Sequence, residues 1–200
     1  MFKLVICDLD GFLLEGVYFS DYLEKEHGVS HAEFLSVLRG EVMSSLAANK
    51  PSFPIWEPHL ATWGLKIGGD EFFKLWFEKE GTKEVVANFE IAKKLKTQAG
   101  LAVVLSDNFM ERAAWVRQSF PSLQMFDKLY FSSETGFTKA TEEAFKKVMQ
   151  DYNVQPQDVL FIDDDKTSVE LAAALGIKGV VYKTTEQLKA DLTGLGLNMQ

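Results

Sequence analysis

The sequence predicts an α/β fold, in which helices cover both faces of a parallel sheet and a small helical cap is inserted after the first strand. Three observations lead to this prediction. Short apolar runs of strand length alternate with longer helical patterns over most of the chain, which is typical of βαβ units. These runs contain β-branched residues and little polar alternation, so the strands are expected to be buried on both faces. Residues 15–82 break the alternation, because they carry helical patterns interrupted by prolines.

The core is expected to begin with a strand that starts at Phe2 and leads into Asp8-Leu9-Asp10-Gly11. Further strands are expected at residues 101–106, 129–131, 159–162 and 179–182, and helices at residues 82–99, 110–118, 141–151, 167–175 and from 184 onward. Gly100 and Gly176 end two of these helices, and Thr184 with Gln187 forms a capping box at the start of the last.

Residues 15–82 are expected to form the cap as a four-helix arrangement, and the catalytic core to comprise residues 1–14 plus 83–200. Ser30 and Glu33 form a capping box at the start of one cap helix, which is expected to run through Phe34, Val37 and Leu38. A Gly-Gly turn precedes another cap helix at residues 70–79. Seven aromatic residues lie close together at residues 53–77 of this segment; most are expected to pack inside the cap, while one or two face the active site. The seven are Phe53, Trp56, Trp63, Phe72, Phe73, Trp76 and Phe77.

Two carboxylates come directly after the first strand. Asp8 and Asp10 are two residues apart, so their side chains point to the same side of an extended segment. A D-x-D-G pattern also occurs in turns and in Ca²⁺ loops, but no later residues supply the other oxygen ligands of such a loop. The pattern therefore gains its meaning from the polar residues that follow the other strands.

Those residues are Ser106, Lys139 and the run Asp163-Asp164-Asp165. A serine at a strand end is often only a turn former, but Ser106 is also placed to donate to a phosphate oxygen, and it lacks a G-x-S-x-G nucleophile motif. The helix dipole disfavours a cation at Lys139, which therefore is expected to balance carboxylates and a phosphate. Three successive acids form either a solvated turn or a site that contains a cation. In a parallel sheet all these segments end at one edge, where ligands bind.

Taken in order, the four segments resemble the motifs of the haloacid dehalogenase-like (HAD) hydrolase superfamily, whose core is Rossmann-like. The matching motifs are D-x-D after strand one, Ser or Thr after strand two, Lys before a helix, and a D-D pair after strand four. The resemblance covers residues 1–14 and 95–185, and includes Glu134-x-Gly136-x-x-Lys139 and the helix at 169–176. The chain is most similar to the subgroup with a helical C1-type cap between the first two motifs, and within it to small sugar-phosphate phosphatases.

Four positions depart from the family pattern. Phe12 stands where Thr or Val is usual, Asp107 where Asn is frequent, Ala140 where Pro is frequent, and Ser168 where the fourth motif often ends in Asn or Asp. None of these changes removes a group that does chemistry. They leave open the detailed phosphate contacts around Ser106 and the surroundings of the metal.

The resemblance implies a phosphatase that hydrolyses a small phosphorylated metabolite, a phosphate monoester, through an aspartyl-phosphate on Asp8. Asp10 is implied to protonate the leaving alcohol and then to deprotonate the water that hydrolyses the intermediate. Ser106 and Lys139 are implied to stabilise charge on the phosphoryl oxygens.

The resemblance also implies Mg²⁺ as the cofactor. Its ligands would be the Asp8 carboxylate, the backbone carbonyl of Asp10 and the Asp164 carboxylate, while Asp163 would support the metal without binding it directly. The sequence leaves open which member of the Asp163–Asp164 pair is the direct ligand.

Three other functions are weighed against the phosphatase. A phosphomutase uses the same residues and stays possible. A 2-haloacid dehalogenase has no leaving alcohol to protonate and does not use the Mg²⁺ site, so Asp10 and Asp164 together argue against it. A non-enzymatic phospho-acceptor also has acids and a lysine at strand ends, but it lacks a long cap insertion and carries its acceptor aspartate on a middle strand.

Composition agrees with a cytoplasmic enzyme. The 200 residues, of which 46% are hydrophobic and 25% charged, are enough for one core and a smaller module. The one cysteine, Cys7, excludes an intramolecular disulfide and is expected to be buried in the first strand. No run has the length of a membrane span and the chain starts directly with a strand, so no membrane partner is expected. A net charge of −8 argues against nucleic acid, and the oligomeric state is expected to be a monomer or homodimer.

Overall fold

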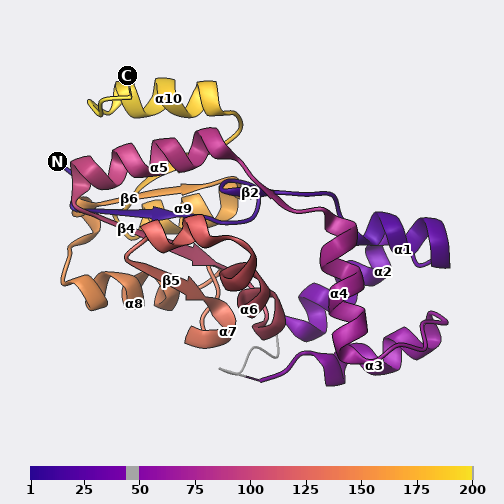
Figure 1. The fold of residues 1–200 in the computed structure, drawn as a ribbon. Helices are drawn as coiled ribbons and strands as arrows, with labels where there is room; N and C mark the ends of the chain where they lie inside the picture. The colour runs from indigo at the N-terminus through magenta and orange to yellow at the C-terminus, as the bar shows by residue number, and fades with distance from the viewer. Residues whose placement is uncertain (44–49, 200) are drawn as a thin grey trace.

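The structure, a computed structural model, describes residues 1–43 and 50–199 (Figure 1). Five strands form one parallel sheet in the order β5-β4-β1-β6-β7. They are β1 (Leu4–Cys7), β4 (Leu101–Ser106), β5 (Lys128–Phe131), β6 (Val159–Asp163) and β7 (Lys178–Val181). The predicted parallel sheet is confirmed, the strand at 101–106 has the predicted bounds, and β6 extends one residue beyond the predicted 159–162.

The register of the sheet brings three strand ends together. Strand β1 is central, and its last residue, Cys7, lies opposite Val104 of β4 and Ile162 of β6. Asp8 follows Cys7, while Ser106 and Asp163 end the two flanking strands. Since the strands are parallel, these three side chains lie at the same edge of the sheet.

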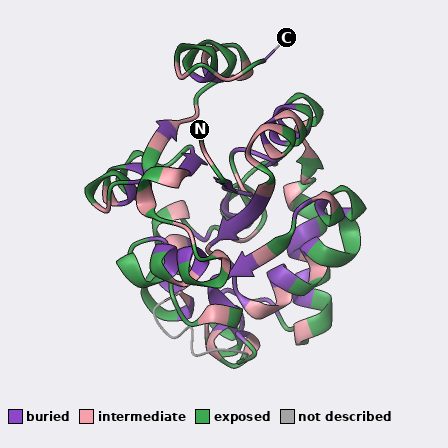
Figure 2. Ribbon diagram, turned by 90° about the vertical axis from the view of Figure 1, so that its left-hand side faces the viewer, coloured by how far each residue is buried: buried purple, intermediate pink, exposed green. Residues whose placement is uncertain are grey.

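Helices cover both faces of the sheet. The alternating side chains of β1 show this: Val5 and Cys7 belong to one apolar cluster, and Leu4 and Ile6 to another. The first cluster is shared with α5 (Val86–Ala99), α6 (Met110–Ser119) and α10 (Thr185–Gly194), the second with α8 (Glu142–Tyr152) and α9 (Lys166–Ala174). Figure 2 shows the buried strands surrounded by helices whose outer faces are exposed. Within the described ranges, no helix is both long enough and apolar enough to cross a bilayer.

The two chain segments between the core and residues 15–82 pair with each other. Strand β2 (Leu14–Glu15) is antiparallel to β3 (Lys83–Glu84), with Leu14 opposite Glu84. The prediction that a helix begins at residue 82 is therefore wrong over its first four residues, because the returning chain forms this strand before α5 begins. Three short turns of helix were not predicted: Pro121–Met125, α7 (Ser132–Thr135) and Pro156–Asp158. The π-helical turn Ser36–Val42 overlaps the helix predicted from Ser30 through Val37 and Leu38.

Four helices lie to one side of the sheet, at the right of Figure 1, and we call them the cap helices. They are α1 (Phe19–His27), α2 (His31–Leu35), α3 (Phe53–Thr62) and α4 (Gly69–Glu80). The predicted helix start at Ser30 is confirmed, because its hydroxyl oxygen accepts the Glu33 N–H at 3.2 Å. Part of the predicted cap, residues 44–49, lies outside the described residues.

The aromatic residues of the cap helices form a cluster of their own. Trp56 is fully buried, with its ring 5.4 Å from that of Phe34 and 5.2 Å from that of Trp76, and Trp63 is only 8% exposed. The other five predicted rings belong to the same cluster or pack against it. Trp56 and Trp63 are thus among the rings that pack in the interior of the cap helices, as expected for most of the seven.

Candidate active site

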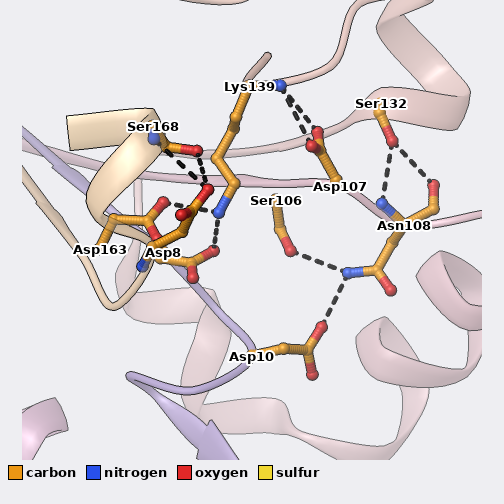
Figure 3. Close-up of polar contacts among 10 residues, drawn as sticks. Asp8, Asp10, Ser106, Asp107, Asn108, Ser132, Lys139, Asp163 and Ser168 are labelled. Atoms are coloured by element: carbon orange, nitrogen blue, oxygen red, sulfur yellow. Dashed lines mark hydrogen bonds and ion pairs between the residues drawn. The ribbon is translucent and has the colours of Figure 1, made fainter. Parts of the chain in front are cut away.

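The residues singled out in the sequence meet at the carboxyl edge of the sheet (Figure 3). Asp8 follows β1, Ser106 ends β4, Asp163 ends β6, and Lys139 precedes α8. The Nζ of Lys139 lies 2.6 Å from Asp8 Oδ1 and 2.6 Å from Asp163 Oδ2. A lysine 24 residues from one carboxylate and 131 from the other thus binds both.

This ion-paired group is almost completely removed from solvent. The side chains of Lys139, Asp8 and Asp163 are 9%, 3% and 0% exposed. Burial raises the pKa of Asp8 well above its usual range, and although Lys139 opposes this rise, Asp163 adds to it. Burial alone would lower the pKa of Lys139, but the two carboxylates outweigh burial and raise it. One ammonium therefore stays charged here, yet it does not compensate both carboxylates.

A third carboxylate adds to the excess of negative charge. Asp8, Asp163 and Asp164 each offer an oxygen, and these oxygens lie within 4.8 Å of one another. Both oxygens of Asp163 have donors, Lys139 Nζ and the backbone N–H of Asp165 at 2.7 Å. The exposed Asp164 carboxylate makes no hydrogen bond or ion pair to any part of the chain that the structure describes. A set of carboxylate oxygens with one free member fits a hard cation such as Mg²⁺.

The turn after Asp10 depends on a glycine. Gly11 has φ +91°, a backbone conformation that favours glycine. A Cβ at this position would lie 2.4 Å from Oδ2 of Asp164. The loop from β1 therefore passes directly over the free carboxylate, and only a residue without a side chain allows this approach.

Asp10 belongs to a second network. Its side chain is 42% exposed; Oδ1 accepts from Arg112 NH2 at 2.9 Å, and Oδ2 accepts from Asn108 Nδ2 at 3.0 Å. The same Asn108 Nδ2 donates to Ser106 Oγ at 2.8 Å. Asp8 and Asp10 thus lie in the same loop but pair with different cations, Lys139 and Arg112.

Asn108, Arg112 and Glu80 were not singled out in the sequence, although the structure brings them to the site. Arg112 is buried on α6 and also bonds to Glu80, the last residue of cap helix α4. One signal was available for Arg112: it is a cation in the first turn of a helix, where the dipole disfavours it, as for Lys139. Asn108 lies four residues earlier. Glu80 had no signal, because its role depends on the path of the returning chain.

Three of the four departures from the family pattern have a structural explanation. Asp107 accepts the backbone N–H of Lys139 with both oxygens, at 2.9 and 3.2 Å, and so fixes the loop that carries this lysine. Ser168 donates to Asp165, which caps α9. Phe12 is fully buried and packs edge-on against Tyr182 at 5.1 Å, so its ring lies in the core and not in the site. Nothing in the structure explains Ala140.

Comparison with known proteins agrees with this geometry. Residues 2–176 match the family model of the haloacid dehalogenase-like hydrolases. Flavin mononucleotide hydrolase 1 of Arabidopsis thaliana is 33% identical over 70 residues, which are 35% of this chain and 29% of that protein. D-ribitol-5-phosphate phosphatase of Bacteroides thetaiotaomicron is 36% identical over 67 residues, 34% of this chain and 32% of that protein. The matches thus span a third or less of these relatives.

Similarity of fold extends over nearly the whole chain. A wild-type HAD family enzyme of Bacteroides thetaiotaomicron, solved in complex with magnesium and inorganic phosphate, superposes with a TM-score of 0.74. The superposition covers 92% of this chain and 95% of that one, at 18% sequence identity. The likeness confirms the fold, and the magnesium and phosphate are properties of that enzyme.

Proposed function

Since the chain belongs to the haloacid dehalogenase-like hydrolase family, we propose that it is a Mg²⁺-dependent phosphatase that hydrolyses a small phosphorylated metabolite through an aspartyl-phosphate on Asp8. One observation carries the proposal: three carboxylates offer oxygens within 4.8 Å of one another, and the only cation bonded to them among the described residues is Lys139. A divalent cation at this point would remove the excess negative charge and allow an anionic substrate to approach.

The proposed metal ligands are the carboxylates of Asp8 and Asp164 and the backbone carbonyl of Asp10. Asp164 is chosen over Asp163 because both Asp163 oxygens already accept hydrogen bonds, from Lys139 and from the Asp165 N–H. Asp163 would then fix the position of Lys139. When bound, Mg²⁺ supplies Lewis acidity and charge compensation between nucleophile and phosphoryl group.

In the first proposed step an Asp8 oxygen forms a bond to phosphorus while the bond from phosphorus to the leaving oxygen breaks. Asp10 gives its proton to the leaving alcohol. In the second step Asp10 takes a proton from water, whose oxygen bonds to phosphorus, and the bond to Asp8 breaks. The products are the alcohol and inorganic phosphate.

Ser106 and Lys139 are proposed to stabilise charge on the phosphoryl oxygens. The contacts of Ser106 support this role, because Asn108 Nδ2 donates to its Oγ and no acceptor for its own hydroxyl hydrogen lies among the described residues. The hydrogen is therefore available for a phosphate oxygen. Lys139 is already bonded to Asp8 and so lies next to the proposed site of attack.

We further propose that residues 15–82 act as the cap of this site over the core of residues 1–14 and 83–200, excluding bulk water from the proposed reaction. Ring contacts between α4 and the N-terminal part of α6 support packing of the cap helices against the core. Phe77 lies 4.7 Å from Trp115, and Trp76 lies 5.1 Å from Phe109, which directly precedes α6. The proposed partner is a small anionic metabolite and not nucleic acid, given the net charge of −8.

The test is a panel of phosphorylated metabolites, including sugar phosphates and flavin mononucleotide, assayed for released inorganic phosphate with Mg²⁺ and with EDTA. We expect hydrolysis with Mg²⁺ and none with EDTA. Full activity in EDTA would contradict the proposal, and release of chloride from 2-chloropropionate under those conditions would indicate a dehalogenase. An isomerised sugar phosphate without free phosphate would indicate a phosphomutase.

Variants of the two acids test the proposed roles. Asp8→Asn is expected to abolish both turnover and the phosphoenzyme. Asp10→Asn, assayed with 2,4-dinitrophenyl phosphate, is expected to accumulate label on Asp8, because this leaving group needs no proton while water still needs a base. Asp158→Asn, a carboxylate next to Lys3 at the opposite edge of the sheet, is the matched control and should behave as wild type. Turnover in Asp8→Asn, or label on another residue, would refute the roles.

A further inference from the structure

Arg112 is a buried cation between two carboxylates that come from different parts of the chain. Its side chain is 8% exposed; NH2 lies 2.9 Å from Asp10 Oδ1, and NH1 bonds to Glu80 Oε2. Asp10 lies in the loop that follows β1, whereas Glu80 is the last residue of the cap helix α4. One guanidinium thus joins the proposed acid–base residue to the cap.

Aromatic rings hold this guanidinium in place. Its Cζ lies 4.8 Å from the ring centre of Trp115 and 5.4 Å from that of Phe77. Because the guanidinium is planar and its donors form a rigid fork, fixing its plane also fixes where its acceptors lie. Asn108 binds the other oxygen of Asp10, so two donors from residues 108–112 determine the orientation of this carboxylate.

Glu80 stands where both linkers between core and cap meet. Its carboxylate accepts from Trp76 Nε1 at 2.7 Å, and its backbone carbonyl accepts from the Val17 N–H at 3.0 Å. A Cβ on Gly16 would lie 2.8 Å from this carbonyl oxygen, so the two linkers are in close contact. Burial raises the pKa of Glu80, while Arg112 and Trp76 oppose the rise, so Arg112 is needed to compensate this buried carboxylate.

We infer that Arg112 is a positioning residue: it orients the Asp10 carboxylate for proton transfer and, through Glu80, links that orientation to the position of the cap. The inference rests on the proposed phosphatase function. A change in the position of α4 relative to the core moves Glu80, and the shared guanidinium transmits the change to Asp10. Arg112 itself does not contact the reacting atoms.

The two proposed chemical steps depend on Asp10 to different extents. With 2,4-dinitrophenyl phosphate, formation of the Asp8 phosphoenzyme needs no proton from Asp10, whereas its hydrolysis needs Asp10 to accept a proton from water. A misplaced Asp10 therefore slows the second step selectively. Misplacement by about 1 Å reduces such a step by roughly 100-fold.

The experiment compares Arg112→Met, Arg112→Lys and Glu80→Gln with wild type on this substrate, in rapid-quench assays with Mg²⁺. For Arg112→Met we expect a burst of dinitrophenolate, a steady-state rate reduced about 10–100-fold, and label on Asp8. Arg112→Lys keeps the charge but not the fork, and Glu80→Gln weakens one partner, so each should show a reduction of about 3–10-fold. If Glu80 acts through Arg112, the double variant Arg112→Met/Glu80→Gln should be no slower than Arg112→Met.

The matched control is Glu111→Gln. Glu111 is the neighbour of Arg112 on α6 and also binds the cap, since it accepts from the N–H and the hydroxyl of Ser52 at 2.8 Å each, but it does not contact Asp10. We expect it to change KM at most, without a burst. The same burst in Glu111→Gln would assign the effect to loosening of the cap and overturn the inference.

The outcomes separate the inference from the function on which it rests. If Asp10→Asn accumulates the phosphoenzyme but folded Arg112→Met does not, the positioning role is wrong while the phosphatase stands. If wild type neither hydrolyses the substrate nor forms a phosphoenzyme, the proposed function fails and the inference with it. Should circular dichroism show that Arg112→Met is unfolded, Arg112→Lys and Glu80→Gln decide, and wild-type second-step rates in both would overturn the inference.

Discussion

Replacing Asp8 by Asn should make the metal-free protein more stable. Asp8 lies 2.6 Å from Lys139, and its cluster oxygen lies within 4.8 Å of those of Asp163 and Asp164. With an effective dielectric constant of about 20, the attraction is about 6 kcal/mol and each repulsion about 3.5 kcal/mol, so the charge terms on Asp8 nearly cancel. The cost of burying its charge, several kcal/mol for an ion, is then left uncompensated.

Asparagine removes this charge but still offers an oxygen to Lys139, which keeps its ion pair with Asp163. We expect Asp8→Asn to raise the free energy of unfolding by about 0.5–2 kcal/mol in EDTA, the range in which stabilising substitutions usually fall. Lys139→Met should have the opposite effect, a loss of about 3–5 kcal/mol, because it leaves buried carboxylates without their cation. Two variants of one cluster thus differ in sign.

The effect should depend on pH in a defined direction. The folded-state pKa of Asp8 is raised, so its contribution to stability is complete below about pH 4 and is lost as the pH rises through the folded value. Wild type in EDTA should therefore lose stability relative to Asp8→Asn as the pH rises from about 4 toward the raised pKa of Asp8. The raised pKa of Lys139 lies far above this window and contributes no slope. Mg²⁺ should reduce or reverse the difference, because it stabilises wild type through Asp8.

Urea unfolding followed by fluorescence, at pH 5 and pH 8 with EDTA or with Mg²⁺, measures these differences. The control is again Asp158→Asn, because the pKa of Asp158 is lowered by its hydrogen bond from Lys3 and its carboxylate therefore should not contribute to the slope between pH 5 and pH 8. If Asp8→Asn is less stable than wild type in EDTA at both pH values, the argument that burial dominates the energy of Asp8 is refuted.

Three further predictions follow from single side chains. Gly11→Ala should displace Asp164, so that at least a tenfold higher Mg²⁺ concentration is needed for the same rise in Tm. Gly64 also has a positive φ of +76° but nothing within 4 Å of its Cβ, so Gly64→Ala should cost only backbone strain of about 1–2 kcal/mol. Trp56→Ala should cost about 3–5 kcal/mol, but Trp56→Phe less than about 1.5 kcal/mol, because the indole N–H has no acceptor among the described residues. Hydrogen bonds from Lys128, Lys147 and Tyr130 lower the pKa of Asp151, so Asp151→Asn should cost about 0.5–1 kcal/mol at pH 7 and progressively less below about pH 4 in denaturation curves.

The sheet and the residues at its edge were predictable because each depends on local pattern and on one rule of topology. An apolar run with β-branched residues predicts a buried strand, and alternation with helices makes the strands parallel. Polar residues at the ends of parallel strands then have to meet, as Asp8, Ser106 and Asp163 do. The contacts of Lys139 with both acids follow from the same rule, because the loop after β5 also ends at this edge.

The connections between core and cap were not predictable in this way. Strand β3 consists of Lys83 and Glu84, two charged residues without any strand pattern, and it forms only because the chain leaves the core at Leu14 and returns beside it. The sequence also does not show which aromatic residues of the cap helices point into their interior and which toward the site. Trp56, for example, is surrounded by the rings of other residues, and no pattern of polar neighbours in the sequence indicates this.

The Asp10 network shows why part of a site stays hidden in a sequence. Arg112 is 102 residues from Asp10 and 32 from Glu80, and its two ion pairs depend on how α6 and α4 pack against each other. No motif contains all three residues, because the two ion pairs form only when α4 packs against Trp115 and Phe109. The acids that would perform the chemistry come from strand ends, which topology fixes, whereas the group that orients one of them comes from a helix contact, which packing fixes. Residues that affect the rate of the proposed reaction without taking part in it are therefore expected where the cap helices contact α6, a region that the strand-end motifs do not include.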